Sequence, residues 1–311
     1  MPENRLFLPE GWRNTPPPTL SQLREAAKSG EILQGTVTRC DISHTLSIPM
    51  GSIRGFIPRE EVVAPWVSGA QRDISYLSRV GKEISFTVKS VGTDEKGAPI
   101  AMLSRRDAQE KAMAFFLDTL QPGMVLAARV THLAPFGAFL DIGCGIIAML
   151  PIELISISRL SHSSERFREG QKILAVVKTF DREKRRITMS HRELLGTWLE
   201  NASRFAPGET VQGIVRSVKD YGSFIELTPN LSGLAENRIG LTAGDRVSVY
   251  IKTIRPERMK IKLQVIEKLP SLEHPPEIEY QITDGQLEHW TYSPPGYEKE
   301  AIETDFTASG P

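Results

Sequence analysis

A short motif that occurs twice constrains the fold of this chain most. Residues 135–142 contain Phe-Gly-Ala-Phe-Leu-Asp, and residues 220–227 contain Tyr-Gly-Ser-Phe-Ile-Glu. Ala138, Leu140 and Ile142 share one face after the first glycine, and Ile225 and Leu227 share one face after the second, which is the pattern of a β-strand with one buried face. The alternation places Phe139 and Phe224 on the polar face, together with the acidic residue that follows, where a large aromatic side chain has no core to fill. Exposed aromatic rings on strands are typical of surfaces on which unpaired bases stack.

The motif belongs to a longer unit that recurs along the chain. Each unit begins with a glycine and a short strand pattern, at Gly30, Gly123 and Gly208. The interval from this glycine to the first aromatic residue is the same in the last two units, as expected for a repeat. Each unit continues with a second glycine, a β-rich run and a final strand. Five short strands in roughly 60–75 residues fit a small closed barrel of the oligonucleotide-binding (OB) type.

We therefore predict an all-β chain of three tandem five-stranded OB barrels with short linker helices. Phe115, Phe116 and Trp198 lie on these linker helices and are expected to be buried. The expected order begins with an N-terminal segment with a short helix (1–29), a degenerate barrel (30–106) and a linker helix (107–121). It continues with a barrel (122–193), a second linker helix (194–206), a third barrel (207–268) and an acidic tail (269–311). The tail has nine acidic residues and one lysine, a composition typical of a solvated segment. Within it, residues 278–282 and 289–292 are candidates for a hairpin.

The charge is unevenly distributed, although the formal net charge of the whole chain is zero. Residues 123–192 hold 11 basic and 6 acidic residues, a net charge of +5, and residues 208–268 hold 10 and 7, a net charge of +3. Basic residues cluster at 182–186 and 255–262, next to the last strand of each unit. In an OB barrel this strand flanks the aromatic strand. Cations beside stacking rings suit single-stranded nucleic acid.

Other functional classes find little support. The sequence has no phosphate-binding loop, zinc-ligand spacing or nucleophile elbow, and residues 143–148 resemble a dinucleotide loop without the helix that should follow. His132, His162 and His191 show no ligand spacing and are expected at the surface or near bound RNA. No apolar run is long enough to span a membrane, no signal-peptide pattern is seen, and the two cysteines form no disulfide framework. We predict a cytoplasmic protein without enzymatic activity, metal or other cofactor.

The three units resemble S1 RNA-binding domains, and residues 30–268 are similar to the ribosomal protein S1 family in its shorter, Gram-positive-type form. The resemblance implies an RNA site of two aromatic residues, a histidine, and an Asp…Arg pair at the last turn. In the second unit these positions hold Phe136, Phe139, Pro151, Asp181 and Arg186. In the third unit they hold Tyr221, Phe224, Glu236, Arg255 and Lys260. Neither unit keeps the histidine. The basic residues expected to contact phosphates are Arg182, Lys184, Arg185 and Arg186.

The first unit departs most from this pattern. Its equivalent stretch, residues 42–48, contains no Phe or Tyr, so His44 is the only candidate ring, and we expect weak RNA binding or a protein-docking role. The resemblance implies a protein that binds single-stranded mRNA and brings it to the small ribosomal subunit in translation. The alternative is a non-ribosomal RNA chaperone, or an adaptor for RNA decay or regulation.

Overall fold

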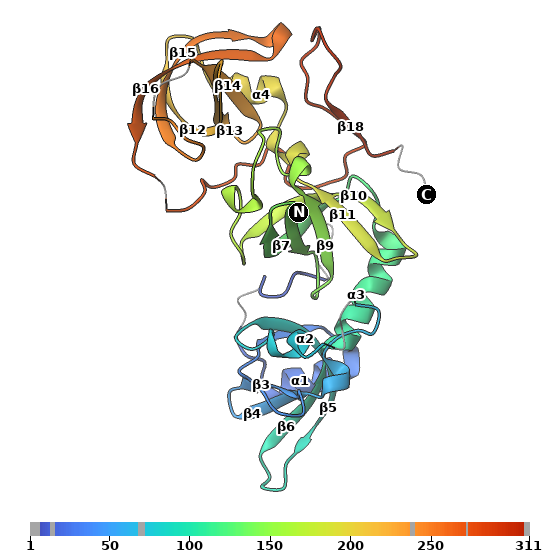
Figure 1. The fold of residues 1–311 in the computed structure, drawn as a ribbon. Coiled ribbons are helices and arrows are strands. Elements are labelled where there is room, and N and C mark those ends of the chain that lie inside the picture. Colours follow the sequence, from blue (N-terminus) through green and yellow to red (C-terminus); the bar gives the residue numbers. More distant parts are fainter. Residues whose placement is uncertain (1–6, 13–15, 68–71, 237–239, 272, 308–311) are drawn as a thin grey trace.

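The computed structural model describes residues 7–12, 16–67, 72–236, 240–271 and 273–307. Three β units follow one another along the long axis of the molecule in chain order (Figure 1). Each unit surrounds a hydrophobic core of its own, and the core of the third extends to residues of the second barrel and of the C-terminal segment. The predicted all-β architecture of tandem units is confirmed.

The first unit is preceded by a helix with a complete N-terminal cap. Helix α1 (Leu20–Ser29) starts after Thr19, whose backbone N–H donates to Gln22 Oε1 at 2.8 Å while its side chain accepts from the Gln22 N–H. This reciprocal arrangement satisfies backbone donors at the start of the helix. The helix ends at Gly30, whose φ of 71° is readily adopted by glycine.

The first unit is a six-stranded sheet, not the closed five-stranded barrel that the sequence predicts. Its strands follow the order β1-β5-β6-β4-β3-β2, where the bounds are β1 (Leu33–Thr36), β2 (Arg39–Cys40), β3 (Leu46–Met50), β4 (Ile53–Ile57), β5 (Glu83–Thr93) and β6 (Pro99–Ser104). The two edge strands are halves of one segment that breaks at Val37 and Thr38. The Val37 N–H bonds to the Lys82 carbonyl, whereas the Thr38 N–H bonds to the Ser47 carbonyl. The segment therefore changes partner strand midway. Short helical turns η1 (Arg59–Glu61) and α2 (Ile74–Leu77) complete the unit.

The second and third units are closed five-stranded barrels, as predicted. The second closes in the order β10-β11-β9-β8-β7, from β7 (Val125–Ala134), β8 (Gly137–Asp141), β9 (Ile147–Pro151), β10 (Lys172–Asp181) and β11 (Arg186–Ser190). The third closes in the order β12-β13-β14-β16-β15, from β12 (Thr210–Lys219), β13 (Gly222–Thr228), β14 (Leu231–Ala235), β15 (Arg246–Arg255) and β16 (Lys260–Leu269). The second barrel carries an insert with the turns η2 (Ile152–Leu154) and η3 (Ser163–Glu165), and η5 (Pro256–Arg258) joins the last two strands of the third.

The connections between units are helical. Helix α3 (Arg105–Thr119) links the first two units, and Phe116 is buried in the core of the second. The second linker is split into η4 (Arg192–Leu195) and α4 (Trp198–Ala202), with the break at Gly196, whose φ is 83°. Trp198 is buried, and Phe115 packs half-buried against the second core, so the predicted packing of these aromatics is confirmed.

The C-terminal segment, residues 269–311, is packed against the barrels over much of its described length, so the prediction of a solvated tail is wrong. Strand β17 (His289–Thr291) pairs with β18 (Glu303–Asp305), not with residues 278–282 as predicted. Leu287, Trp290, Tyr292 and Phe306 join a buried cluster that contains residues of the second and third barrels. Figure 1 shows the segment passing between these two barrels.

His191 gives a pH-dependent prediction. The sequence predicts this residue at the surface or near bound RNA, but it is fully buried. Its Nδ1 lies 2.8 Å from the Ile155 carbonyl oxygen, and its Nε2 lies 3.3 Å from the Tyr280 hydroxyl. Burial lowers the pKa of His191 from 6.5 to about 4. The folded state therefore resists protonation, and stability is lost as the pH falls from 6.5 through 4. We expect His191 to account for a loss of about 3 kcal/mol over this interval.

The measurement is urea unfolding of the native chain and of His191→Gln at several pH values between 7.5 and 4. The amide of glutamine can still donate to the Ile155 carbonyl but does not titrate in this range. The difference between the two chains isolates the contribution of His191, because other titrating groups are common to both. Parallel pH profiles would contradict the prediction.

Candidate nucleic-acid interface

Two aromatic side chains stand on the outer surface of the second barrel. Phe136 precedes β8 and is 59% exposed, and Phe139 lies within β8 with its ring 6.1 Å from that of Phe136 at an interplanar angle of 90°. His132 on β7 is the register partner of Phe139 and stacks on it at 6.1 Å and 27°. His132 Nδ1 lies 3.0 Å from Glu169 Oε1. The site therefore contains a third ring, that of His132, for which the sequence predicts only a position at the surface or near bound RNA.

The third barrel repeats this arrangement. Tyr221 precedes β13 and is 69% exposed, and its ring lies 6.2 Å from that of Phe224 at an interplanar angle of 89°. The glycine between the two aromatics permits this geometry. A Cβ atom on Gly137 would lie 2.2 Å from the Leu150 carbonyl oxygen, and one on Gly222 would lie 2.6 Å from the Ala235 carbonyl oxygen. The close approach of two backbones therefore requires glycine in both copies.

The strand register relates the aromatics to the basic turns. Phe139 faces Met149 on β9, which in turn faces Thr188 on β11. Arg186 lies two residues before Thr188 on the same face of β11, and it pairs in register with Asp181 across the β10–β11 turn. In the third barrel the corresponding row is Phe224, Leu234 and Lys262, with Lys260 two residues before Lys262 and Arg255 as its register partner. Asp181, Arg186, Arg255 and Lys260 are all exposed.

Several groups in the basic cluster 182–186 have structural partners. Arg182 donates from Nε and Nη2 to the carbonyls of Leu117 and Leu120 near the end of α3, where a cation is favourable. The Arg185 guanidinium lies 5.1 Å from the Trp66 ring centroid in the first unit. These two side chains hold the second barrel to the linker and to the first unit. Lys184 pairs with Asp181 at 3.3 Å. Arg186 has no ion pair among the described residues, which makes it the best placed of the four predicted phosphate contacts.

Asp181 is paired differently from the expected Asp…Arg arrangement. Its carboxylate accepts the Lys184 backbone N–H at 2.9 Å and lies 3.3 Å from Lys184 Nζ. The backbone hydrogen bond from Lys184 is the main reason that the pKa of Asp181 lies below its ordinary value. The carboxylate therefore shapes the β10–β11 turn and keeps its charge beside the basic cluster.

The acidic residues that follow the aromatics lie on the outer face of their strands, as the alternation predicts, but they are buried and not solvated. Asp141 is 2% exposed and accepts backbone N–H groups of Gly143, Gly145 and Glu10 at 2.8–3.0 Å. Glu10 in turn accepts two hydrogen bonds from Arg105, at 2.6 and 3.0 Å. Burial, together with the nearby Glu10 charge, raises the pKa of Asp141 to about 7. The N-terminal segment thus covers this end of β8.

Glu226 occupies the equivalent position in the third barrel and is 4% exposed. Its carboxylate accepts two hydrogen bonds from Arg166, at 3.0 and 2.7 Å, and two from Arg216, at 2.9 and 3.0 Å. Burial alone would raise the pKa of Glu226, but the two guanidinium groups hold it below its ordinary value. Arg166 comes from the insert of the second barrel, so this ion pair joins the two barrels. Only the aromatic end of each strand remains open.

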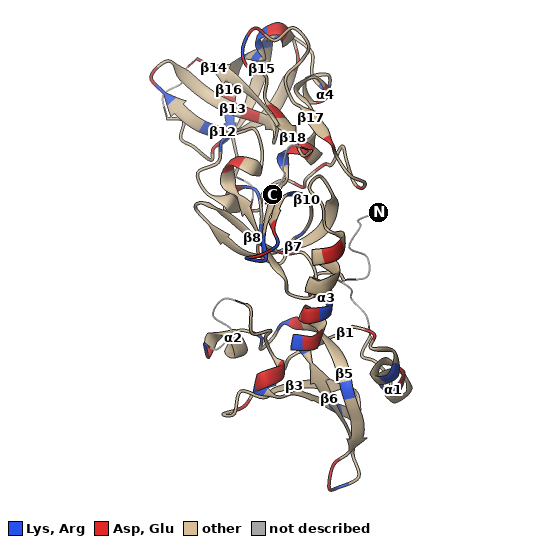
Figure 2. Cartoon of the chain, turned by 90° about the vertical axis from the view of Figure 1, so that its right-hand side faces the viewer, with Lys and Arg blue, Asp and Glu red and all other residues tan. Residues whose placement is uncertain are grey.

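The first unit offers no comparable pair of exposed rings in the residues that the structure describes. His44 packs on Tyr76 of α2, with 5.1 Å between ring centroids, and its Nε2 lies 3.4 Å from Asp73 Oδ1. This candidate ring is therefore engaged within its own unit. Figure 2 shows that basic and acidic residues occur along the backbone of all three units, so the charge pattern alone does not single out one unit.

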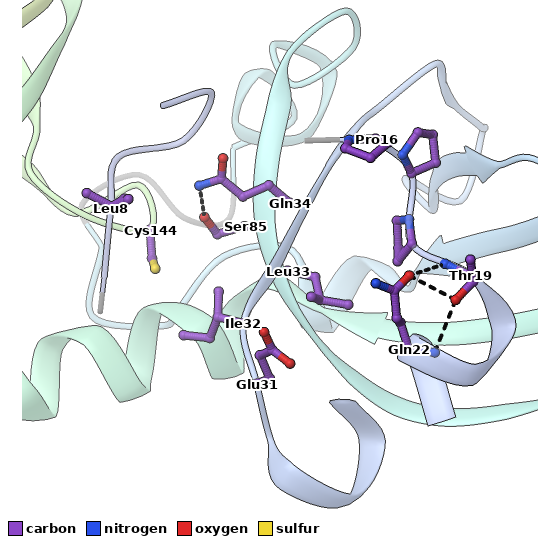
Figure 3. A pocket seen from close by; sticks show the side chains of 12 residues that line it. Leu8, Pro16, Thr19, Gln22, Glu31, Ile32, Leu33, Gln34, Ser85 and Cys144 are labelled. Atoms are coloured by element: carbon purple, nitrogen blue, oxygen red, sulfur yellow. Dashed lines mark hydrogen bonds between the residues drawn. The ribbon is translucent and has the colours of Figure 1, made fainter. Parts of the chain in front are cut away.

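A cavity of about 540 Å³ lies beside the first unit (Figure 3). Its lining includes Pro16–Pro18, Gln34, Ser85 and Cys144, with Gln34 Nε2 donating to Ser85 Oγ at 3.1 Å. None of the predicted RNA-binding residues lines it. Among the described residues, no group of three His, Cys, Asp or Glu side chains is arranged to hold a metal ion. No helix of the described ranges has the length and apolar character needed to cross a membrane.

Comparison with known proteins matches residues 119–192 to the family model described as S1 RNA binding domain. The chain is 30% identical over 246 residues to small ribosomal subunit protein bS1 of Leuconostoc lactis, covering 73% of this chain and 55% of that protein. It is 29% identical to the bS1 homolog of Bacillus subtilis, covering 75% and 63%, and 31% identical to bS1 of Neisseria meningitidis, covering 78% and 44%. The chain thus spans about half the length of these relatives. The matches confirm the resemblance predicted from the repeats.

Proposed function

Because this chain carries an S1 RNA-binding domain and is similar to bS1 proteins over most of its length, we propose that it binds single-stranded RNA on the second and third barrels. The observation that supports this most is the repeated pair of perpendicular aromatic rings, Phe136 with Phe139 and Tyr221 with Phe224. A ring exposed on a barrel surface offers a base a flat apolar face, and stacking does not depend on the identity of the base.

The phosphates of the bound strand would run beside the exposed cations. Arg186 in the second barrel and Lys260 in the third flank the aromatic rows at equivalent positions, and Arg255 is the register partner of Lys260. Each cation that contacts a phosphate adds a salt-dependent contribution to affinity, whereas stacking persists at high salt. We expect Arg185 to contribute less, because Trp66 already holds its guanidinium.

The relatives are named as proteins of the small ribosomal subunit, and we extend this to a role in translation, with mRNA as the bound strand. Co-sedimentation with washed small ribosomal subunits separates this proposal from the non-ribosomal alternative. A chain that binds single-stranded RNA but stays in the supernatant would favour a chaperone or an adaptor for RNA decay or regulation.

We expect Phe139→Ala and Phe224→Ala each to weaken binding of single-stranded RNA by about 1–3 kcal/mol, the contribution of one base–aromatic stack. Both side chains are half-buried on barrel surfaces, so the variants should fold. Fluorescence anisotropy with a labelled polypyrimidine measures the affinity, and a thermal melt measures the stability. Tyr250→Ala is a matched control, because Tyr250 is exposed on β15 away from the aromatic pair. If a Phe variant melts early but binds normally when folded, its side chain is part of the core and the proposal fails for that barrel.

A further inference from the structure

A second cavity, of about 480 Å³, lies next to the aromatic pair of the third barrel. Four parts of the chain line it: the insert of the second barrel, helix α4, the third barrel and the C-terminal segment. The lining residues that matter here are Tyr221, Phe224, Arg159, Lys219, Tyr292 and Tyr297. We propose that this cavity holds one unpaired nucleobase of an RNA strand together with its phosphate. The inference rests on the proposed RNA binding and adds a specific site to it.

The walls of the cavity have the side chains that a nucleobase requires. Tyr221 and Phe224 come from the barrel, whereas Tyr292 and Tyr297 come from the C-terminal segment and Trp198 from α4. Trp198 and Tyr292 are themselves buried, so the accessible rings are Tyr221 and Phe224 on the barrel and the half-buried Tyr297 on the C-terminal segment. Extruded bases are commonly held by aromatic side chains from separate elements in this way. Its volume falls within the range of about 300–1,000 Å³ typical of small-ligand sites. The pair of rings on the barrel thereby forms one wall of an open cavity.

The charge of the lining favours an anion. Arg159, Arg216 and Lys219 line the cavity, and no carboxylate does so among the residues that the structure describes. This is notable because the C-terminal segment is strongly acidic. Glu298, which follows Tyr297, pairs with Arg258 at 3.2 Å outside the lining. Arg216 is neutralised by Glu226 and Glu165, but the exposed Arg159 has no ion pair among the described residues. Arg159 is therefore the group best placed to contact a phosphate.

Hydrogen bonds between the lining elements fix the cavity before any ligand arrives. In the insert, the Ile157 N–H donates to Asn230 Oδ1 at 3.0 Å and the Ser158 hydroxyl lies 2.7 Å from that of Ser232. The Tyr292 hydroxyl donates to the Asn230 carbonyl oxygen. The Glu298 N–H donates to the Glu257 carbonyl at 3.3 Å, which ties the segment to the β15–β16 turn. A preformed site avoids the entropic cost of ordering its walls on binding.

The test measures binding of a labelled oligouridine to the full chain by fluorescence anisotropy. We expect Tyr297→Ala to weaken binding roughly ten-fold, because one stacking face is lost, and Tyr297→Phe to bind almost as the native chain does. Arg159→Gln should bind more weakly and show a flatter dependence of affinity on salt concentration. The matched control is Arg24→Gln, an exposed arginine on α1 that is remote from the cavity. Thermal melts of all variants show whether each is folded.

A second readout keeps the result interpretable if Tyr297→Ala disturbs the segment. An oligonucleotide containing 4-thiouridine is photo-crosslinked to the native chain, and the modified residues are identified by mass spectrometry. Crosslinks within residues 157–159 or 292–302 support the cavity. Crosslinks confined to the aromatics of the second barrel, with unchanged affinity of Tyr297→Ala and Arg159→Gln, overturn it while leaving the proposed function intact. No binding of the oligonucleotide by the native chain overturns both.

Discussion

Replacing Glu226 by alanine is expected to lower the free energy of unfolding by about 3–5 kcal/mol, because it leaves buried cations without their partner. The Arg166 and Arg216 side chains are only 2% and 5% exposed, and each donates two hydrogen bonds to the Glu226 carboxylate. Arg216 retains Glu165 as a second partner at 2.7 Å, but Arg166 loses its only ion pair among the described residues. Urea unfolding followed by tryptophan fluorescence measures the loss.

The matched control is Glu298→Ala, which removes an exposed ion pair with Arg258 in the same part of the molecule. Exposed pairs contribute about 0–1 kcal/mol, so this variant should unfold almost as the native chain does. Equal stabilities of the two variants would show that the Glu226 cluster does not hold the second and third barrels together. Because Arg166 belongs to one barrel and Glu226 to the other, we also expect Glu226→Ala to increase proteolysis of the insert.

The aromatic pairs could be predicted from the sequence because they depend on local rules. Alternation along a strand decides which face a side chain occupies, and the glycine before Phe139 or Phe224 marks a position where two backbones come close. The same rules located the strands and the linker helix α3. These features need only residues that are near one another in the chain.

The carboxylates that follow the aromatics could not be placed in this way, because distant residues cover them. Asp141 is the acceptor of the Glu10 N–H from 131 residues away, and Glu226 binds Arg166 from 60 residues away. Alternation correctly puts both on the outer face of their strands, but it carries no information about which segment packs over that face. Each of these acids therefore connects its barrel to a preceding part of the chain, and each limits the open surface to the aromatic end of the strand.

The same limitation explains why the composition of the C-terminal segment was misleading. Its acidic residues satisfy the pattern of a solvated tail, yet some of them pair with basic residues outside the segment, as Glu279 does with Arg204 and Glu298 with Arg258. The few large apolar residues between them decide its position. Trp290 and Tyr292 lie 5.8 Å apart between ring centroids and are buried against the linker and both barrels.

Trp290→Ala is accordingly expected to destabilise the packing of the C-terminal segment by about 3–5 kcal/mol, the usual cost of removing a buried tryptophan. Trp290 is 6% exposed, lies in the cluster with Leu194, Trp198 and Phe306, and has the Arg192 guanidinium 5.9 Å from its ring centroid. Chemical unfolding measures the global loss, and limited proteolysis of residues 273–307 measures the release of the segment. Release would also open the proposed nucleobase cavity, because Tyr292, Tyr297 and Ile302 line it.

Trp12→Ala is the matched control, since Trp12 also lies in a terminal segment but is only half-buried, with Lys172 Nζ 5.5 Å from its ring centroid. A partly exposed ring excludes less water from apolar surface, so its removal should cost less. The prediction would be contradicted if the C-terminal segment were freely solvated. Trp290→Ala would then melt as the native chain does, and protease would cleave residues 273–307 at the same rate in both. That outcome would also remove the C-terminal wall from the nucleobase cavity.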